Sequence, residues 1–310
     1  MAKKILVVGL ACVDIISVVT EYPEEDTDQR VLDYYWQRGG NAANTSCVLS
    51  LLGAQSEFLG TFAADREAEF LKETFKKYEV CTDNCVTYPD SVKTPASVVI
   101  INSQNGSRTI LHHGKNWPEY LYADFKKIDL AKYSWIHFEG RSSCEEIKSK
   151  LLWIDEYNKT VDKNNRIHTS LEMEKTARLG LDNLYDTVDT LFVSKEFVRS
   201  RGYHTKEEAV QHLITKCRKG AEIICAWGEE GAVAMDADGT LHSSPAFPPK
   251  LQAGQFMDTL AAGDTFNGAF IMSRSSGRDL SESLIFGCKV AGAKCGMKGI
   301  DGLHMFRKSS

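Results

Sequence analysis

The stretch Asp258-Thr259-Leu260-Ala261-Ala262-Gly263-Asp264-Thr265-Phe266 decides the fold of this chain. Small and apolar residues lead to a Gly-Asp pair, and a helix-compatible run follows from Thr265 to Ser273. A glycine-containing turn that opens a helix points several unpaired backbone N–H groups and the positive end of the helix dipole at one place, which attracts phosphate. Asp264 stands at that place and is able to accept a proton. The pattern therefore predicts phosphoryl transfer to a hydroxyl group, and the alternative is an ordinary helix start capped by an aspartate.

A second glycine-containing stretch, Gln37-Arg38-Gly39-Gly40-Asn41-Ala42-Ala43-Asn44, opens another expected helix. Two adjacent glycines allow the backbone to approach a ligand closely. Asn41 and Asn44 are three residues apart, so they share one face of the helix. Because amide side chains both donate and accept hydrogen bonds, the pair suits a polyhydroxylated ligand. The alternative is a glycine turn followed by an asparagine cap.

The composition is that of an average globular protein, because 43% of the 310 residues are hydrophobic and 25% are charged. The formal net charge of -5, without a basic stripe, argues against nucleic acid as a partner. The sequence has no run of the roughly 18 apolar residues needed to cross a membrane, and we recognise no secretory signal after Met1. The nine cysteines are scattered without a paired zinc spacing, so we expect free thiols and a cytoplasmic location.

Strand-like and helix-like patterns alternate over most of the chain, which predicts an α/β fold with a mostly parallel sheet covered on both faces. The expected strands are residues 5–9, 56–62, 96–102, 107–112, 135–139, 167–172, 190–193, 223–227, 232–235 and 240–242. The expected helices are residues 41–52, 66–78, 145–160, 207–216, 264–274 and 281–294. Ligands of such sheets bind beyond the carboxyl ends of the strands. Asp14 follows the first strand and the turn Gly228-Glu229-Glu230-Gly231 follows a later one, so both stand at such ends.

Two β-rich segments, residues 14–38 and 94–115, contain no helix pattern and interrupt this alternation. The second segment has the turn Asn105-Gly106 between two β-rich runs, which is a strong hairpin signal. We interpret the two segments as one inserted small sheet that serves as a lid.

The two glycine-containing motifs together resemble the signatures of the ribokinase-like (PfkB) carbohydrate kinase family. Gly39, Gly40 and Asn44 match the family's Gly-Gly-x-x-x-Asn pattern. The family's Asp-Thr-x-Gly-Ala-Gly-Asp pattern is matched by Asp258, Thr259, Ala262, Gly263 and Asp264. The order and the separation of the motifs fit the family as well. The resemblance implies one ribokinase-like domain over residues 1–310, with a twisted, mostly parallel sheet, flanking helices and a small β lid.

The resemblance covers nearly the whole chain and is strongest to the animal, fructose-phosphorylating branch of the family. The matching segments are residues 36–41, 135–141, 225–231, 246–249 and 288–296. This branch implies ATP-dependent phosphorylation of D-fructose at its 1-hydroxyl group, giving fructose 1-phosphate and ADP. ATP would bind with Mg²⁺, and whether K⁺ is also required stays open. The partners would be the small-molecule sugar and ATP, and two chains would pair through their lids as a homodimer.

The resemblance also implies roles for individual residues. Asp264 would be the catalytic base, and an aspartate with the ordinary pKa of about 3.9 is ionised at neutral pH. The backbone amides of Ala261, Ala262, Gly263 and Asp264 would form an anion hole over the transferred phosphoryl group. The sugar pocket would comprise Asp14, Gly40, Asn41, Asn44 and Asp264. The nucleotide would contact the anion-hole residues and Arg108, Gly228, Glu229, Glu230, Gly231, Pro248, Asn267, Cys288, Ala291 and Cys295.

Two departures from the family pattern affect the expected chemistry. Ala261 replaces the first glycine of the carboxy-terminal motif, which is costly if φ is positive at this position and tolerable if φ is negative. The Asn-x-x-Glu motif that helps to organise Mg²⁺ is replaced by Ser194-Lys195-Glu196. The metal ligands are therefore unassigned, with Glu172, Glu174 and Glu196 as candidates.

Other interpretations stay open at this point. Another sugar or nucleoside kinase of the same family would share these sugar-facing residues. A catalytically silent nucleotide-binding relative would explain Ala261 and the missing Asn-x-x-Glu motif. A dinucleotide-binding oxidoreductase is disfavoured, because residues 8–12 lack the Gly-x-Gly-x-x-Gly pattern after the first strand. Outside the resemblance, Cys288, Ala291 and Cys295 at helical spacing indicate core packing, and Arg108 an exposed strand residue.

Overall fold

An eight-stranded sheet forms the body of the computed structural model, which describes residues 3–89, 92–114, 116–251 and 257–307. The strand order is β14-β13-β12-β11-β10-β9-β1-β4. The strands are β1 Lys4–Val8, β4 Ser56–Leu59, β9 Tyr133–Glu139, β10 His168–Met173, β11 Thr190–Ser194, β12 Glu222–Ala226, β13 Ala232–Met235 and β14 Leu241–Ser244. Neighbouring strands from β4 to β12 are parallel, whereas β13 pairs antiparallel with β12 and with β14. The predicted α/β fold with a mostly parallel sheet is confirmed.

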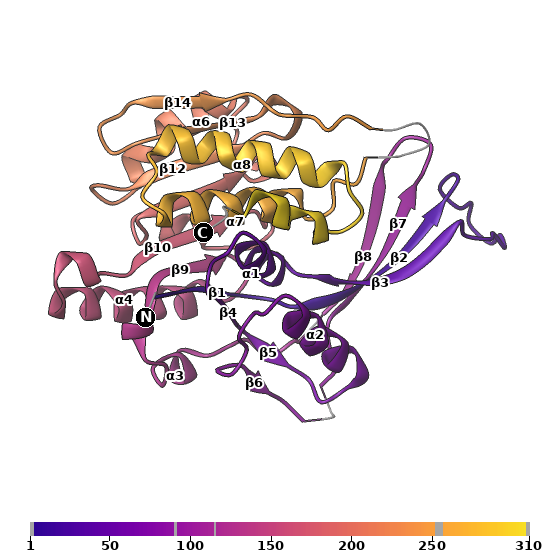
Figure 1. Ribbon diagram of the computed structural model, residues 1–310, viewed down its shortest axis with the longest axis horizontal. Helices are drawn as coiled ribbons and strands as arrows, with labels where there is room; N and C mark the ends of the chain where they lie inside the picture. The colour runs from indigo at the N-terminus through magenta and orange to yellow at the C-terminus, as the bar shows by residue number, and fades with distance from the viewer. Residues whose placement is uncertain (1–2, 90–91, 115, 252–256, 308–310) are drawn as a thin grey trace.

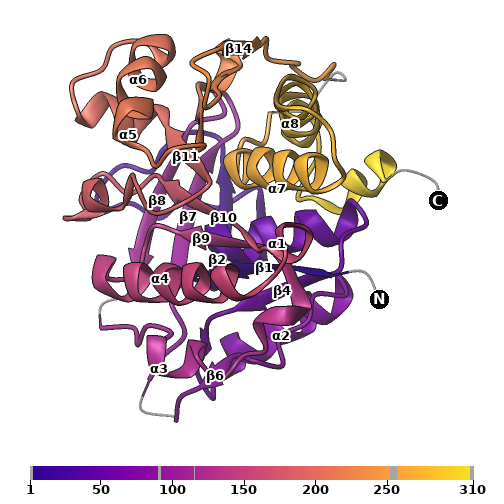
Figure 2. The same ribbon diagram turned by 90° about the vertical axis from the view of Figure 1, so that its left-hand side faces the viewer.

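Helices cover both faces of this sheet (Figure 2). One face packs against α1 (Asn41–Leu51), α2 (Arg66–Lys77), α7 (Ala262–Ser275) and α8 (Leu280–Cys295). The other face packs against α4 (Cys144–Thr160), α5 (Lys195–Ser200) and α6 (Lys206–Leu213), with the short α3 (Tyr122–Phe125) nearby. Single 3-10 turns lie at Leu130–Lys132, Lys163–Asn165, Leu181–Leu184, Ile214–Lys216, Gly228–Glu230 and Asp301–Phe306. Within the described chain, no helix has both the length and the apolar character needed to cross a membrane.

Local sequence signals fix the helix starts. The Asp65 carboxylate accepts a hydrogen bond from the Ala68 backbone N–H and so caps α2. Asp279 and Glu282 form a capping box at the start of α8. Residues 42–49 of α1 are all buried, because the helix lies between the sheet and α7. The polar side chains among them, Asn44, Thr45 and Ser46, are therefore hydrogen-bonded inside the protein.

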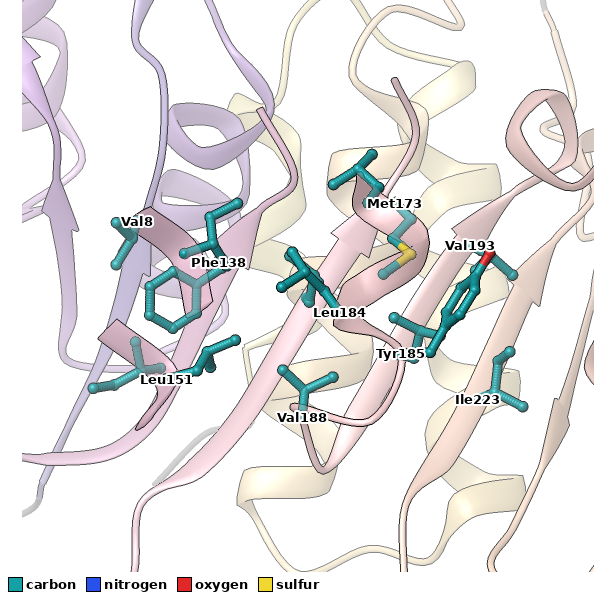
Figure 3. Packing of buried hydrophobic residues seen from close by; sticks show 14 of the residues in the cluster. Val8, Phe138, Leu151, Met173, Leu184, Tyr185, Val188, Val193 and Ile223 are labelled. Atoms are coloured by element: carbon teal, nitrogen blue, oxygen red, sulfur yellow. The ribbon is translucent and has the colours of Figure 1, made fainter. Parts of the chain in front are cut away.

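The core on the α4 face is built by side chains from neighbouring parallel strands, as Figure 3 shows. Five of them come from β1, β9, β10, β11 and β12 in turn, namely Val8, Phe138, Met173, Val193 and Ile223. Leu151 of α4 and the segment Leu184–Val188 pack against this row. The parallel strands are buried on both faces, which explains their continuous apolar runs.

A second, four-stranded sheet projects from one end of the body (Figure 1). Its order is β3-β2-β7-β8, with β2 Cys12–Val19, β3 Asp33–Gly39, β7 Ala96–Asn102 and β8 Arg108–His113. β7 and β8 pair antiparallel, so the predicted hairpin around Asn105-Gly106 is confirmed. The two β-rich segments therefore do form one separate small sheet, and Lys115 at the end of the second lies outside the described residues.

Two details of the prediction were wrong. The expected strand 56–62 is broken at Gly60, where a Cβ atom would lie 2.6 Å from the Gly9 carbonyl oxygen. Beyond this close approach, β5 (Thr61–Phe62) pairs with β6 (Val86–Thr87) in a separate sheet. The expected helix 207–216 leaves the α-helical form after Leu213 and tightens into a 3-10 turn. Asp14 follows the first strand as expected and lies in β2.

Candidate active site

The start of α7 presents unpaired backbone N–H groups. The helix begins at Ala262, and the Gly263 and Asp264 amides donate to no backbone carbonyl among the described residues. The Ala262 amide, which was expected in the anion hole, instead donates to the Thr259 carbonyl oxygen at 3.2 Å. Free amides at the positive end of a helix dipole favour anion binding, and we call this helix start the anion cradle.

Ala261, directly before this turn, adopts the left-handed conformation with a φ of 61° and a ψ of 16°. An L-residue pays about 1–2 kcal/mol for that conformation, whereas glycine pays none. The sequence left open whether φ at Ala261 is negative or positive, and the structure has the positive φ, which is energetically costly for alanine. The alanine stores strain at the edge of the anion cradle.

A buried ion pair ties the loop before α7 to α8. Lys294 is fully buried, and its Nζ atom lies 2.7 Å from Oδ2 of Asp258. The same Nζ donates to the Asp258 carbonyl oxygen at 2.8 Å. Oδ1 of Asp258 accepts a hydrogen bond from the Leu260 backbone N–H at 3.0 Å. Both carboxylate oxygens and the lysine are thus satisfied, which a buried ion pair requires in order to hold a loop in one conformation.

Asp264 is oriented by a chain of hydrogen bonds from the amino-terminal motif. Its Oδ2 atom accepts a hydrogen bond from Nδ2 of Asn44 at 2.7 Å. The Asn44 amide oxygen in turn accepts from Nε and Nη2 of the buried Arg38, at 3.2 and 2.9 Å. The Thr45 hydroxyl donates to the Asp264 carbonyl oxygen at 3.4 Å. Since Arg38 can only donate, it fixes which end of the Asn44 amide faces Asp264.

Burial changes the proton affinity of Asp264. Loss of water raises the pKa of this carboxyl group to about 7, against the hydrogen bond from Asn44, which lowers it. The carboxylates of Glu174 and Glu139 raise it further, and Lys175 lowers it. The expectation of an aspartate with its ordinary pKa is therefore wrong for this site. A base whose pKa lies near neutral pH is better suited to take a proton from a hydroxyl group.

Asp14 lies against the Gly39-Gly40 pair. A Cβ atom on Gly39 would be 2.4 Å from both carboxylate oxygens of Asp14, so only glycine fits there. Gly40 has a φ of 96°, and its Cβ atom would lie 2.3 Å from the Leu10 carbonyl oxygen. Burial raises the pKa of Asp14 to about 6, although hydrogen bonds from Ser97 and Cys12 lower it. The two glycines thus place a carboxylate beside the start of α1.

Asn41, the first residue of α1, donates to two carboxylates at the carboxyl end of β10. Its Nδ2 atom lies 3.0 Å from Oε2 of Glu172 and 2.7 Å from Oε2 of Glu174. The other oxygen of Glu172 accepts a hydrogen bond from Nδ2 of Asn267 on α7 at 2.7 Å. Lys175 pairs with Glu174. The structure therefore brings together two predicted site residues, Asn41 and Asn267, through a glutamate that the sequence marked only as a metal candidate.

Glu139 and Arg141 belong to the same region and were missed as site residues. Oε2 of Glu139 accepts hydrogen bonds from the backbone N–H groups of Leu10 and Ala42, at 2.9 and 3.3 Å. Its Oε1 accepts from Nε of Arg141 at 2.6 Å. A polar residue that ends a buried parallel strand is a sequence signal for the ligand-binding edge of the sheet. Both Glu139 and Glu172 have that position.

The residues predicted for the nucleotide site come from three segments near β13 and β14. They are Gly228, Glu229, Glu230 and Gly231 between β12 and β13, Pro248 after β14, and Cys288, Ala291 and Cys295 in α8. A Cβ atom on Gly231 would lie 2.1 Å from the Ser244 carbonyl oxygen, and β14, which ends at Ser244, packs against α8. The chain just before Pro248 passes directly over Gly292 of α8, where a Cβ atom would lie 1.9 Å from the Phe247 carbonyl oxygen.

Arg108 starts β8 of the small sheet and reaches the loop before α7. Its Nη1 atom donates to the hydroxyl of Thr259. From the same loop, Leu260 packs on the apolar cluster of the small sheet, which comprises Ile16, Val18, Val99 and Ile101 with Tyr35. A surface arginine that contacts the anion-binding loop is placed to meet phosphate oxygens.

The metal candidates do not form a site by themselves. Glu196 is exposed on α5 and makes no recorded contact with Glu172 or Glu174, whose carboxylates are occupied by Asn41. Among the described residues, no group of three or more His, Cys, Asp or Glu side chains is arranged to hold a metal ion. The donor set fits a Mg²⁺ ion that arrives on the nucleotide phosphates rather than one in an all-protein cage.

Comparison with known proteins places this site in a family. The model of the pfkB family carbohydrate kinases matches residues 2–302, so the chain belongs to this family. Ketohexokinase of Mus musculus is 45% identical over 97% of this chain and 99% of its own length. Ribokinase of Arabidopsis thaliana is 24% identical over 96% of this chain and 77% of its own length.

Solved structures share the fold. The Arabidopsis thaliana ribokinase, complexed with ribose and ATP, aligns with a TM-score of 0.77 at 21% identity, over 98% of this chain and 96% of that chain. The nucleoside kinase of Methanocaldococcus jannaschii aligns with a TM-score of 0.67 at 18% identity, over 97% of each chain. At these identities the likeness establishes the ribokinase-like fold, and the substrate has to be argued from the site.

Replacing Ala261 with glycine tests the strain at the anion cradle. Because glycine adopts a positive φ freely, A261G should raise the free energy of unfolding, by up to about 1 kcal/mol once the flexibility of glycine in the unfolded chain is subtracted. Urea titration measures this difference. Ala262→Gly, in the first turn of α7, is the matched control and should lower the stability by about 0.5–1 kcal/mol. Equal losses in both variants would show that position 261 is not strained.

Proposed function

We propose that this chain is an ATP-dependent kinase that transfers a phosphoryl group to the 1-hydroxyl of D-fructose, giving fructose 1-phosphate and ADP. The observation that carries the proposal is the position of Asp264. Its buried carboxylate accepts a hydrogen bond from Asn44 at the first turn of α7, beside backbone amides that are free to bind an anion. The choice of fructose rests on the likeness to mouse ketohexokinase over nearly the full length of both chains.

The proposed reaction uses Asp264 as a general base. One carboxylate oxygen accepts the proton of the 1-hydroxyl group, the hydroxyl oxygen bonds to the γ-phosphorus of ATP, and the bond from that phosphorus to the bridging oxygen of ADP breaks. Negative charge that develops on the phosphoryl oxygens is stabilised by the amides of Gly263 and Asp264. Mg²⁺ bound with ATP supplies further neutralisation of the phosphates.

The acceptor sugar is proposed to lie between the small sheet and the start of α1. Asp14 accepts hydrogen bonds from sugar hydroxyls, and Asn44 and Asn41 offer amide groups on the same side as Asp264. Gly40 allows the sugar to approach the backbone. The adenine nucleotide is proposed to extend from the anion cradle past Arg108 towards the segments around Gly231 and Cys288. These assignments extend the family resemblance to the positions that the structure brings together.

A second candidate function is phosphorylation of ribose or of a nucleoside by the same machinery. It is favoured by the shared fold of the ribokinase and the archaeal nucleoside kinase. The proposed base and anion cradle would be unchanged, and only the acceptor would differ.

A substrate panel tests the proposed function directly. We expect ATP-dependent ADP release to be fastest with D-fructose among fructose, tagatose, ribose, glucose and adenosine, and ³¹P NMR to place the phosphate on C1. Asp264→Asn should lose at least about 100-fold in kcat with the fold retained, because the amide cannot accept the proton. Turnover restricted to another acceptor would replace fructose while keeping the machinery. Wild-type-like kcat in D264N would refute the base.

The raised pKa values predict a pH dependence. Because Asp264 acts as a base only when deprotonated, kcat/KM should fall as the pH drops through about 7, and more steeply below about 6 as Asp14 is protonated as well. Steady-state rates from pH 5 to 9 measure the profile, with circular dichroism as the control for folding. Asn44→Ala removes a hydrogen bond that lowers the pKa of Asp264, so its acid limb should shift to higher pH. A profile that stays flat to pH 5 contradicts this assignment.

We propose that two chains pair through the exposed part of the small sheet around Val98 and Leu111, and that this sheet acts as a lid. Strand register places Trp36, Ile15, Val98 and Leu111 in one cross-strand row. Leu111 is 58% exposed, Val98 40% and the neighbouring Tyr34 57%. An apolar row on a sheet face is a typical protein interface.

The nine cysteines are all free, which supports a reducing compartment and a cytoplasmic location.

Light scattering tests the pairing. We expect a mass of twice the 34.6 kDa of one chain, because burying the apolar row stabilises the pair. Leu111→Glu places a charge in that row and should give single chains. Leu179→Glu is the control, since Leu179 is 90% exposed and does not belong to the small sheet. A single-chain mass for the unaltered protein would end the proposal of a dimer.

A further inference from the structure

One buried carboxylate, that of Glu172, connects the two sides of the active site. Glu172 lies at the carboxyl end of β10 and is only 7% exposed. Its Oε2 atom accepts a hydrogen bond from Asn41 of α1 at 3.0 Å, and its Oε1 atom accepts one from Asn267 of α7 at 2.7 Å. Asn41 belongs to the proposed sugar pocket, and Asn267 to the proposed nucleotide site.

This geometry fixes the orientation of both amides. Both asparagines turn their NH₂ groups toward Glu172, and each of its two carboxyl oxygens accepts one of these hydrogen bonds. Asn41 also directs the same NH₂ group at Glu174, at 2.7 Å. The amide oxygen of Asn41 is therefore the atom left to accept a hydrogen bond from a sugar hydroxyl. Glu172 in this way selects which atom each asparagine offers.

Because of the charges around Glu172, losing the hydrogen bond from one asparagine affects the hydrogen bond from the other. Burial raises the pKa of Glu172 well above its ordinary value, and the carboxylates of Glu174, Asp264 and Glu139 raise it further. The hydrogen bond from Asn41 lowers it again, while the cations nearest to this cluster, Lys175 and Arg141, pair with Glu174 and Glu139. A buried carboxylate that loses one donor is poorly satisfied and must rotate or take up a proton. Either change alters the hold on the remaining asparagine.

We propose that Glu172 is a positioning residue that couples the acceptor and nucleotide sites, so that occupation of one site strengthens binding at the other. The proposal rests on the proposed function, in that it takes Asn41 to face the sugar and Asn267 the nucleotide. Coupling runs through the one carboxyl group that both asparagines share, and it needs no movement of the small sheet.

Calorimetric binding of ADP, with and without saturating fructose, measures the coupling. In the unaltered protein, fructose should tighten ADP binding at least about fivefold, and ADP should tighten fructose binding by the same factor. Glu172→Gln offers one oxygen and one NH₂ group, so it satisfies only one of the two asparagines. The coupling ratio, defined as the Kd of ADP without fructose divided by the Kd of ADP with fructose, should therefore fall to about one. Glu174→Gln is the matched control. Its side chain contacts Asn41 and not Asn267, so fructose binding should weaken while the ratio stays.

A second set of variants tests the coupling without relying on E172Q. Asn267→Ala removes the nucleotide-side contact of Glu172, so the coupling ratio should fall to about one in this variant as well. Asn41→Ala should change the Kd of ADP at least about twofold even without sugar, although Asn41 contacts no proposed nucleotide residue directly. Thermal unfolding of each variant separates loss of folding from loss of coupling.

The outcomes separate this proposal from the proposed function. The coupling proposal is overturned if the coupling ratio stays high in E172Q and N267A, or if it is about one in the unaltered protein. Neither result affects the proposed kinase function, which the substrate panel tests separately. If the panel identifies another acceptor, that acceptor replaces fructose in the binding experiment and only the identity of the sugar changes. An unchanged Kd of ADP in N41A overturns the coupling whether or not any sugar is accepted.

Discussion

The hydrogen bond between Asn44 and Asp264 is the interaction on which this site depends, because it joins residues that are 220 positions apart in the chain. It forms only where α1 and α7 lie close together. Gly268 makes that approach feasible, since a Cβ atom there would lie 2.9 Å from the Val48 side chain and 3.2 Å from the Thr45 carbonyl oxygen. The close packing of α1 against α7 therefore also determines the position of the proposed base, Asp264.

Burial has opposing consequences at this edge of the sheet. It raises the pKa of Asp14, Asp264 and Glu172, which means that each ionised carboxylate lowers the stability of the fold near neutral pH. The same loss of water strengthens every hydrogen bond and charge interaction that these groups make. The hydrogen bonds that these groups accept, such as those from Asn44 to Asp264 and from Asn267 to Glu172, offset part of the destabilisation. Such an arrangement is typical of a functional site rather than of a structural core.

Local sequence was sufficient to predict the sheet, most helix boundaries and the glycine-containing helix start of α7, because these follow from periodicity, caps and glycine placement within a short window. The shared carboxylate of Glu172 and the ion pair between Lys294 and Asp258 were not predictable in this way. Their partners come from other elements, and only the completed fold shows which carboxylate meets which donor. The break at Gly60 has the same origin, since it depends on the close approach of Gly9 from a neighbouring strand.

Ala261 shows how tertiary contacts sustain an unfavourable local conformation. An alanine with positive φ costs about 1–2 kcal/mol and would leave that conformation in an unconstrained loop. Here the preceding residues are held by Lys294 through Asp258, and Thr259 is held by Arg108, while the Asn44 hydrogen bond fixes the helix that follows. Strain persists where the surroundings determine the backbone from both sides. The departure from the family's glycine therefore lowers stability more than it alters the direction of the amides, and the proposed anion cradle keeps its geometry.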